Sequence, residues 1–490
     1  MSVAWLTAGD EGGLALCRGS MFTAGAIAAA LALGALGAIA APYELGAVLV
    51  IALVLLGTRL SLTVIRGLLL AALLLVPDVP SGESWGFMVH WSQGLTWSNF
   101  VIPALALPLL LGVALTGRRL TPRRWPGLAR GCLMLLGWCL VSLLIASPDS
   151  GLSPSARATL WAHWVKLALF LWLGVVVAGG CRAEARGLRR VLWAALAVNA
   201  VVGLAQAVRW LPVFSPLGDS VAGLGVRASG LFYDANMYGV LSAWALLWLL
   251  HQEAGQHGAR RMGYWLLALA AAGNLASAAS RAGFLALAAG TVLLLWCREW
   301  RTATWVGLII AALVVLAPAR GWQRMLSAAQ TVRADVDGAA HDSLTGGDAT
   351  TSERLASMSQ AWRQIRQHPF WGLGFGRALY LGVPAIEPGP VRPMETSPFE
   401  GAQDMPLTVL AETGPVGLLL FLAAVASSLR GLARHRAMGT ASFDALPLLA
   451  GYAGLLAACF TIEALWNARL LMLVVVLTTL AVPPEPEAAV

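Results

Sequence analysis

The chain has 490 residues, of which 58% are hydrophobic and only 12% are charged. A soluble domain carries about 25% charged residues, so this composition excludes an ordinary soluble protein and predicts a polytopic membrane protein. The formal net charge of +8 does not indicate nucleic-acid binding. The arginines fall in short clusters between apolar segments, and membrane orientation explains such clusters.

The six cysteines are scattered, with no Cys-x-x-Cys pair and no histidine cluster beside any of them. That pattern argues against a disulfide framework and against a metal site. We therefore expect no metal and no cofactor. The apolar run from Met21 lacks a clear small-residue cleavage site and is predicted to be a retained first span.

Taken in order, fourteen apolar segments are predicted to cross the bilayer as helices, the second being the shortest. They are Met21–Ala41, Tyr43–Leu56, Leu60–Val76, Phe100–Thr116, Leu128–Ala146, Leu160–Gly179, Arg190–Trp210, Asp234–Leu250, Met262–Ala279, Ala282–Cys297, Thr302–Ala317, Pro406–Leu429, Ala445–Thr461 and Leu465–Val482. The predicted fold is all-α, with twelve to fourteen spans.

Arginines are distributed unevenly between the loops that join these segments. One alternating set of loops carries clusters such as Arg260–Arg261 and Arg298–Arg301, whereas the short loops of the other set hold only Arg157, Arg227 and Arg281. Since positive charge accumulates in cytoplasmic loops, the first set and both termini are predicted to lie inside. Arginines close to other span ends, Arg66 and Arg209 among them, are predicted to snorkel.

The polar stretch Ala319–Met405 carries eight arginines and nine acidic residues and interrupts the apolar chain. We divide the chain into spans 1–11 (1–317), an outer loop (318–405), spans 12–14 (406–483) and a cytoplasmic tail (484–490). Loops of this length are functional or disordered. Apolar residues recur at helical spacing from Leu355 to Ile365 and Pro369 stops the pattern, so short helices and a folded cap are predicted.

Arg227 and Arg281 stand out, because an arginine at membrane depth costs roughly 2.5–3.5 kcal/mol on insertion scales and marks a functional candidate. Snorkelling at a helix end is the alternative. Arg227 opens a turn in which Asp234 or Asn236 can cap the following helix, and Arg281 directly follows Ser280. Two outward arginines beside a helix N-terminus predict a diphosphate clamp. Asn236 and Ser280 are assigned to it as well.

The loop also holds a Gly-rich turn, in which Gly372, Gly374 and Gly376 occupy alternate positions. Such glycines allow close backbone approach to a ligand or to another segment. A structural role is preferred for His368, because it ends a helix before a proline. The residues assigned to the loop and acceptor side are His368, the three glycines, Glu400 and His341.

Four segments on the predicted outer side together resemble the bacterial O-antigen ligase and O-antigen polymerase superfamily. They are Arg227 with Gly230 and Asn236; Ser280-Arg281-Ala-Gly; His368-Pro-Phe-Trp-Gly-Leu-Gly; and Asp404 through Glu412-Thr-Gly-Pro-Val-Gly417. The resemblance implies a metal-independent, inverting membrane glycosyltransferase of the GT-C type. It also implies that the arginines matching Arg227 and Arg281 hold the diphosphate of a lipid carrier.

One departure concerns the catalytic base. Ligases of the family carry a His-Asn pair before a Gly-x-x-Gly turn, and the histidine is taken there to activate the acceptor hydroxyl. This chain has Gln403-Asp404 in that register, with Gly414 and Gly417 in place. Glutamine cannot act as a general base, whereas a partly desolvated aspartate can. The predicted catalytic residues are therefore Asp404 with Gln403 beside it, and the departure favours the polymerase side of the superfamily.

The expected activity is extension of a surface polysaccharide, O-antigen or exopolysaccharide, at the periplasmic face of the bacterial inner membrane. Expected partners are an undecaprenyl-diphosphate-linked oligosaccharide, a glycan acceptor, the bilayer and a chain-length regulator. Ligation to lipid A-core or protein is the first alternative, and a transporter or flippase for lipid-linked sugars is the second. A transporter favours ionisable residues within spans and internal repeats, and the charge here gathers at the outer mouth instead.

Overall fold

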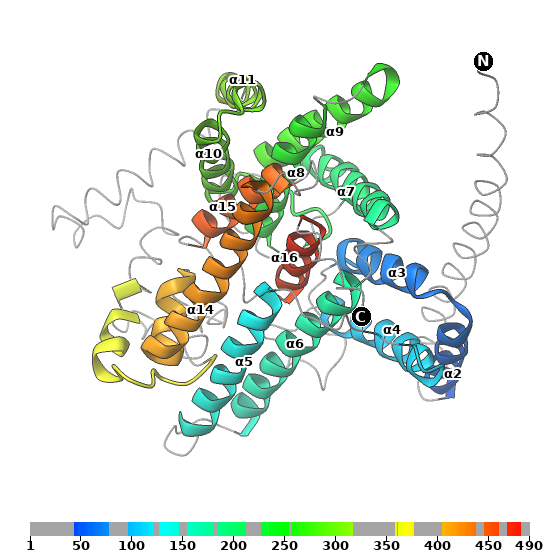
Figure 1. The fold of residues 1–490 in the computed structure, drawn as a ribbon, viewed down its shortest axis with the longest axis vertical. Coiled ribbons are helices and arrows are strands. Elements are labelled where there is room, and N and C mark those ends of the chain that lie inside the picture. Colours follow the sequence, from blue (N-terminus) through cyan, green and yellow to red (C-terminus); the bar gives the residue numbers. More distant parts are fainter. Residues whose placement is uncertain are drawn as a thin grey trace. The chain divides into compact units, whose positions relative to one another are not determined.

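The structure is a computed structural model (Figure 1). It describes residues 44–77, 97–118, 120, 127–146, 154–179, 185–211, 227–232, 234–253, 257–316, 358–359, 361–376, 404–437, 445–459 and 468–481. Within this part of the chain the regular structure is entirely helical. The prediction of an all-α fold is therefore confirmed for these residues.

Every predicted span from the second onward coincides with a helix, and the first lies outside the described residues. The helices are α2 (Glu44–Arg59), α3 (Leu62–Leu75), α4 (Trp97–Leu115), α5 (Gly127–Ala146), α6 (Pro154–Ala178), α7 (Ala185–Ala207), α8 (Ala235–Glu253), α9 (Gly258–Ala278), α10 (Arg281–Trp296), α11 (Trp300–Leu316), α14 (Met405–Ala437), α15 (Ala445–Ala458) and α16 (Ala468–Ala481). Long apolar runs bounded by polar segments account for this agreement, even where a proline lies inside the run, as Pro415 does in α14.

Four helical stretches of the described part are long and apolar enough to cross a membrane: Gly127–Ile145, Leu160–Ala178, Gly187–Ala207 and Met405–Gly431. Shorter apolar helices accompany them, among them Arg281–Trp296 and Arg469–Thr479. The protein is therefore membrane-embedded. The number of fourteen spans and the GT-C-like topology stay predictions.

The chain divides into two compact units, the smaller formed by residues 1–65 and 104–120. In this unit α2 and α4 approach closely through Gly57 and Gly112, since a Cβ on either glycine would overlap backbone atoms of the other helix. Small residues at such contacts are typical of helix packing in membranes. Arg118 donates to the carbonyls of Thr58 (2.9 Å) and Leu60 (2.8 Å), at the C-terminal end of α2.

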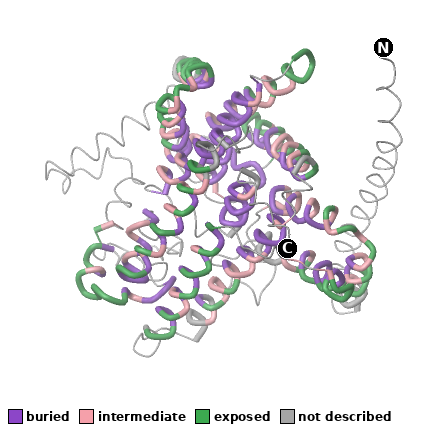
Figure 2. The backbone as a smooth tube through the Cα atoms, viewed as in Figure 1, coloured by how far each residue is buried: buried purple, intermediate pink, exposed green. Residues whose placement is uncertain are grey.

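The larger unit comprises residues 66–103 and 121–490, and α8 is enclosed within it. Buried residues run along nearly its whole length (Figure 2). The helix packs against α9, α10, α11 and α15, while α5 pairs with α14 and α6 with α16. A helix that is apolar all round and surrounded by others is placed in the interior of the bundle.

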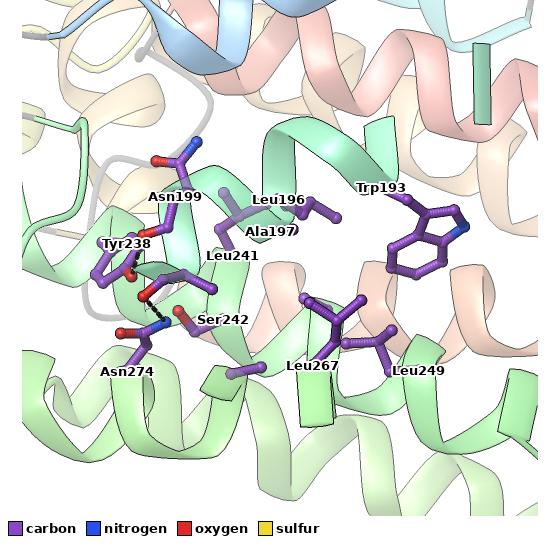
Figure 3. Close-up of a pocket in the computed structure, with 13 residues that line it drawn as sticks. Trp193, Leu196, Ala197, Asn199, Tyr238, Leu241, Ser242, Leu249, Leu267 and Asn274 are labelled. Carbon is purple, nitrogen blue, oxygen red and sulfur yellow. Dashed lines mark hydrogen bonds between the residues drawn. The ribbon is translucent and has the colours of Figure 1, made fainter. Parts of the chain in front are cut away.

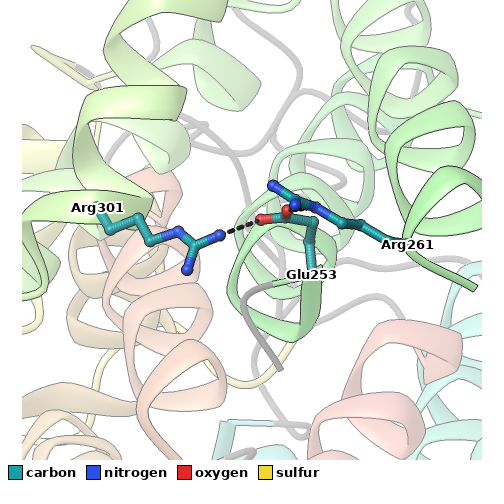
Figure 4. Close-up of polar contacts among 3 residues, drawn as sticks. All are labelled: Glu253, Arg261 and Arg301. Carbon is teal, nitrogen blue, oxygen red and sulfur yellow. Dashed lines mark hydrogen bonds and ion pairs between the residues drawn. The ribbon is translucent and has the colours of Figure 1, made fainter. Parts of the chain in front are cut away.

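Two predicted cytoplasmic loops meet at one end of this helix group. Glu253, at the end of α8, is 1% exposed, and its carboxylate accepts from Arg261 Nε at 2.5 Å and lies 3.4 Å from Arg301 Nη2 (Figure 4). The two arginines are about half exposed, so the pairs are expected to contribute at most about 1 kcal/mol each. Their arrangement agrees with the predicted alternation of loops, and the cytoplasmic side itself stays a prediction.

The snorkelling assigned to Arg66 is wrong. Arg66 is buried within α3, and its Nε donates to the carbonyl of Val176 in α6 at 2.9 Å. A buried guanidinium can satisfy a carbonyl of a neighbouring helix, and the position of Arg66 near a span end did not reveal that contact. Arg209, in contrast, is exposed just after the end of α7.

Candidate functional site

The segment that begins with Arg227 lies along the turn between α9 and α10. The backbone N–H of Ala228 donates to the carbonyl of Ser277 at 3.2 Å. Arg227 Nε donates to the carbonyl of Ala278 at 2.9 Å. The loop carrying Arg227 and the turn leading into Arg281, distant in sequence, are therefore neighbours.

Asn236 joins the predicted clamp residues to one another. Its Oδ1 accepts from Arg227 Nη2 at 3.0 Å and from the Ser280 hydroxyl at 3.1 Å. Arg281 follows Ser280 directly as the first residue of α10. Arg227, Arg281 and Asn236 are half-buried. The four residues assigned to the clamp thus occupy one small region of the fold.

Two helix N-termini converge at this region. Asp234 caps α8, because its Oδ1 accepts from the N–H of Asn236 at 2.7 Å; of the two proposed caps, the structure selects this one. Ser280 caps α10 by accepting from the N–H of Gly283 at 3.1 Å. The first turns of α8 and α10 touch through Gly239, where a Cβ would lie 2.6 Å from that of Ser280. Converging helix N-termini favour an anion.

Buried amide side chains from α7 hold the backbone of the loop that carries Arg227. Gln206 is fully buried, and its Oε1 accepts from the N–H groups of Ser229 (3.1 Å) and Gly230 (2.8 Å). Asn199 Oδ1 accepts from the N–H of Leu231 at 3.2 Å. Neither residue was predicted from the sequence to belong to the site. Their signal was two polar residues seven positions apart, on one face of an otherwise apolar helix.

Arg469 of α16 supports the same loop from another side. It is 2% exposed, and its guanidinium donates to the carbonyls of Leu73 (Nε, 2.8 Å) and Leu231 (Nη1, 3.3 Å). The guanidinium carbon also lies 4.6 Å from the centre of the Phe232 ring. Sequence reasoning did not assign it to the site. Its signal was an arginine at the start of a span.

A small cavity lies between α7, α8 and α9, behind the loop (Figure 3). Its polar end is formed by Asn199, Tyr238 and Asn274, and Trp193 lies at the apolar end. Tyr238 donates to the carbonyl of Asn199 at 3.0 Å. The space inside it is about 20 Å³, which is room for about one water molecule. None of the four residues assigned to the clamp lines this cavity.

At the start of α14, Asp404 is the helix cap. Its Oδ1 accepts from the N–H of Leu407 at 2.9 Å, and the next residue, Met405, donates its N–H to the carbonyl of Cys459 at 2.7 Å. Asp404 is 8% exposed. Burial raises the pKa of its carboxyl, and the bond from Leu407 opposes that rise. Asp404 is thus a partly desolvated aspartate, and its role as a general base stays a prediction. Gln403, Glu400 and His341 lie outside the described residues.

The Gly-rich turn packs on a break in α14. Gly414 has φ 68° and ψ −173° inside the helix, which interrupts the hydrogen bonding of the carbonyls before it. Leu373 donates its N–H to the carbonyl of Ala411, and Gly374 donates to that of Glu412, both at 2.9 Å. Of the two partners expected for this turn, a ligand or another segment, the structure places another segment against it.

Side chains from α5 donate further hydrogen bonds to the carbonyls at the break in α14. The carbonyl of Glu412 also accepts from the Ser142 hydroxyl at 3.0 Å, and that of Thr413 accepts from Trp138 Nε1 at 2.8 Å. Trp138 stacks on Trp371 of the turn, with ring centres 5.7 Å apart. Irregular backbone at membrane depth is tolerated where protein groups satisfy it. The turn is therefore built into the fold at this point.

His368 follows the helical residues 361–367, and its side chain is exposed. Pro369 ends the helix as predicted, and the carbonyl of His368 accepts from the N–H of Gly372 at 3.2 Å. This backbone bond agrees with the preferred structural role. Among the described residues, no three His, Cys, Asp or Glu side chains gather closely enough to hold a metal ion.

Comparison with known proteins gives one family match. Residues 266–422 match the family model described as O-Antigen ligase. A comparison with curated proteins gives no match. The matched range contains Arg281, the Gly-rich turn, Asp404 and the break at Gly414, whereas Arg227 precedes it. The match confirms the resemblance to the O-antigen ligase and polymerase superfamily, whose members ligate or polymerise glycans at a membrane.

Proposed function

From the family match over residues 266–422, we propose that this protein is a glycosyltransferase of the bacterial inner membrane. It uses a glycan carried on undecaprenyl diphosphate and extends a cell-surface polysaccharide at the periplasmic face. Transfer is inverting and independent of metal. The acceptor is the free end of another copy of the glycan.

The observation that carries this proposal is the joining of the Arg227 loop to the N-terminus of α10. Arg227 and Ser280 share Asn236 Oδ1, and Arg281 is the next residue. Arginine suits phosphate because its planar fork donates two parallel hydrogen bonds. The two capped helix ends add partial positive charge in the same place. This arrangement fits a diphosphate, which carries several negative oxygens.

The chemistry requires stabilisation of a leaving group. The acceptor hydroxyl attacks the anomeric carbon, the bond from that carbon to the diphosphate oxygen breaks, and the electron pair stays on the diphosphate. Arg227 and Arg281 stabilise the charge that develops there, as fixed cationic donors do in other transfer reactions. The sugar is joined to the acceptor oxygen with inverted configuration, because attack is from the face opposite the departing diphosphate.

Asp404 is the proposed base that takes the proton of the acceptor hydroxyl. Its burial favours the neutral carboxyl and therefore strengthens the carboxylate as a base near neutral pH. Gln403, beside it in the chain, is proposed to orient the acceptor. Glu400 and His341 are the other candidate bases of the outer loop. That loop is proposed to shape the acceptor groove and to exclude water, which competes as a nucleophile.

Ligation is the second candidate function, and the printed description of the matched family, O-Antigen ligase, favours it. Polymerisation is preferred because Gln403 stands where the ligases carry the base. A glutamine there removes the group that ligases use for activation. The two functions differ in the acceptor, glycan against lipid A-core.

The test is turnover of a purified undecaprenyl-diphosphate glycan by the protein in lipid nanodiscs, without added metal and with a chelator present. The expected product is a longer glycan on the same lipid carrier. The same assay is run on Arg227→Ala, which is expected to lose activity. Arg209→Ala is its matched control, because Arg209 is exposed after α7 and lies outside the clamp. Transfer to added lipid A-core without chain extension would establish ligation, and absence of both products would overturn the proposal.

A further inference from the structure

Gln206 makes an unusually complete set of bonds to the loop that begins at Arg227. Its Oε1 accepts from two successive N–H groups, those of Ser229 and Gly230, and its Nε2 donates to the carbonyl of Gly230 at 3.0 Å. The side chain is fully buried. One carboxamide therefore satisfies three backbone groups of a two-residue stretch.

A carboxamide is the side chain that fits these three groups. Its oxygen offers two acceptor sites and its nitrogen donates. A carboxylate lacks the donor, and an apolar side chain leaves buried N–H groups without partners, which is costly. The turn is also sterically defined, because Gly230 has φ 57° and a Cβ there would lie 2.5 Å from the Tyr238 ring. The loop therefore has one well-defined backbone conformation.

This conformation determines where Arg227 stands. Ser229 and Gly230 follow it by two and three residues, so a shift of their backbone moves the Cα of Arg227. The guanidinium reaches two fixed oxygens, at 2.9 Å on Ala278 and 3.0 Å on Asn236. Both bonds have ordinary lengths, and displacement by about 1 Å takes them beyond hydrogen-bonding distance.

We propose that Gln206 is a positioning residue for Arg227: by clamping the backbone of Ser229 and Gly230, it aims the guanidinium at the anion between the N-termini of α8 and α10. The proposal rests on the proposed function for the identity of that anion as a diphosphate. Asn199 and Arg469 hold the next residue of the same loop, Leu231. Gln206 acts closest to Arg227.

The test replaces Gln206 by methionine, which keeps the length of the side chain and removes its hydrogen bonds. The first readout compares the variant with the wild type in three quantities: the KM for the lipid-diphosphate glycan, kcat and the melting temperature. We expect KM to rise about tenfold or more. A merely structural role lowers the melting temperature and the yield of folded protein and leaves the KM of that protein unchanged.

The second readout is a double-mutant cycle with Arg227→Ala. Residues that act through one another are non-additive. Gln206→Met is therefore expected to change affinity by less than about threefold once Arg227 is already alanine. Additive losses, or an unchanged KM together with an unchanged kcat in the single variant, would overturn the positioning role.

Arg66→Met is the matched control for removal of a buried polar side chain. Arg66 donates to the carbonyl of Val176. It lies about two helical turns along α3 from Leu73, whose carbonyl accepts from Arg469, a support of the Arg227 loop. We expect it to lower the melting temperature and to leave KM unchanged.

A separate assay distinguishes failure of this proposal from failure of the proposed function. Farnesyl diphosphate binding and backbone hydrogen exchange across residues 227–240 are measured for the wild type and for Gln206→Met. Weaker binding with faster exchange in the variant supports positioning even if the wild type turns over no glycan. Equal binding and equal exchange overturn positioning and leave the proposed function standing.

Discussion

The structure contains two glycine-containing stretches of irregular backbone that differ in their bonding partners. They are residues 227–232 and residues 370–376. In the first, backbone groups bond to buried side chains: Gln206, Asn199 and Arg469. In the second, N–H groups bond to carbonyls that the break in α14 leaves open, those of Ala411 and Glu412.

The difference separates a loop proposed to bind the ligand from a structural turn. The Gly-rich turn uses its donors on another part of the chain, so its backbone is part of the packing. The Arg227 loop is held from behind by neighbouring helices, and its arginine reaches toward two helix N-termini. Glycine content alone does not distinguish these cases, because glycine permits close approach to any partner.

The largest expected effect is that of Arg227→Ala. We expect glycan extension to fall by about 10² to 10³-fold, the cost of removing one donor to developing charge. Arg227→Lys is expected to recover little, because an ammonium cannot make the forked contact. The measurement is turnover of the lipid-diphosphate glycan with the melting temperature in parallel. Wild-type rates in both variants would remove the distinction between the two stretches.

The next effect tests Asp404, the proposed general base. Asp404→Asn is expected to reduce turnover by about 10²-fold, the lower end of the usual contribution of a general base. Asparagine caps helices about as well as aspartate, so the melting temperature at neutral pH is expected to hold. Unchanged turnover would eliminate Asp404 and direct the search to Glu400 and His341.

The same variant has a pH signature. Burial raises the pKa of Asp404, so the wild-type rate falls as pH drops through that raised value, and Asp404→Asn lacks this limb. The stability of the folded protein changes with pH in the opposite direction to the rate. The folded protein binds the proton more tightly than the unfolded chain, so stability falls as pH rises from the ordinary pKa to the raised one. The comparison of melting temperatures at pH 4 and pH 7 checks this slope.

A smaller effect concerns the structural turn. Gly372 has φ 69°, and a Cβ there would lie 2.5 Å from the backbone of Glu412. Gly372→Ala is therefore expected to cost about 1–3 kcal/mol or more of stability through strain and overlap. The KM of the remaining folded protein is expected to stay unchanged. Thermal unfolding in detergent measures the loss.

Gly137→Ala is the matched control for that change. Gly137 lies within α5, and a Cβ added there would meet no atom within 4 Å. Alanine in a helix is more favourable than glycine by up to about 1 kcal/mol. Destabilisation by Gly137→Ala equal to that by Gly372→Ala would show that the packing of the turn on α14 is unimportant.

The smallest expected effect is that of Ser280→Ala. It removes the cap of α10 and the bond to Asn236, which costs about 1 kcal/mol. Turnover is expected to fall only several-fold, because both arginines remain. The control is Ser277→Ala. It removes a hydroxyl that donates to the carbonyl of Asn274, and both residues lie in α9. Equal effects of the two variants would argue against a special role for Ser280.

The sequence by itself determined the helices, because apolar periods and their polar interruptions are local. It also singled out Arg227 and Arg281, since an arginine on the outer side opposes a rule that can be read residue by residue. The family resemblance depended on short motifs in order along the chain, which are likewise visible without coordinates.

Only the tertiary structure decided which residues meet. It joined Arg227 to Asn236, made Gln206 and Arg469 supports of the loop, and placed the Gly-rich turn on the break in α14. A buried amide or arginine looks the same in sequence whether it satisfies its own helix, a distant carbonyl or a ligand. Its role depends on the partner that folding brings within about 3 Å, and that partner can lie nine residues away along the chain, as Asn236 does from Arg227, or 238 residues away, as Leu231 does from Arg469.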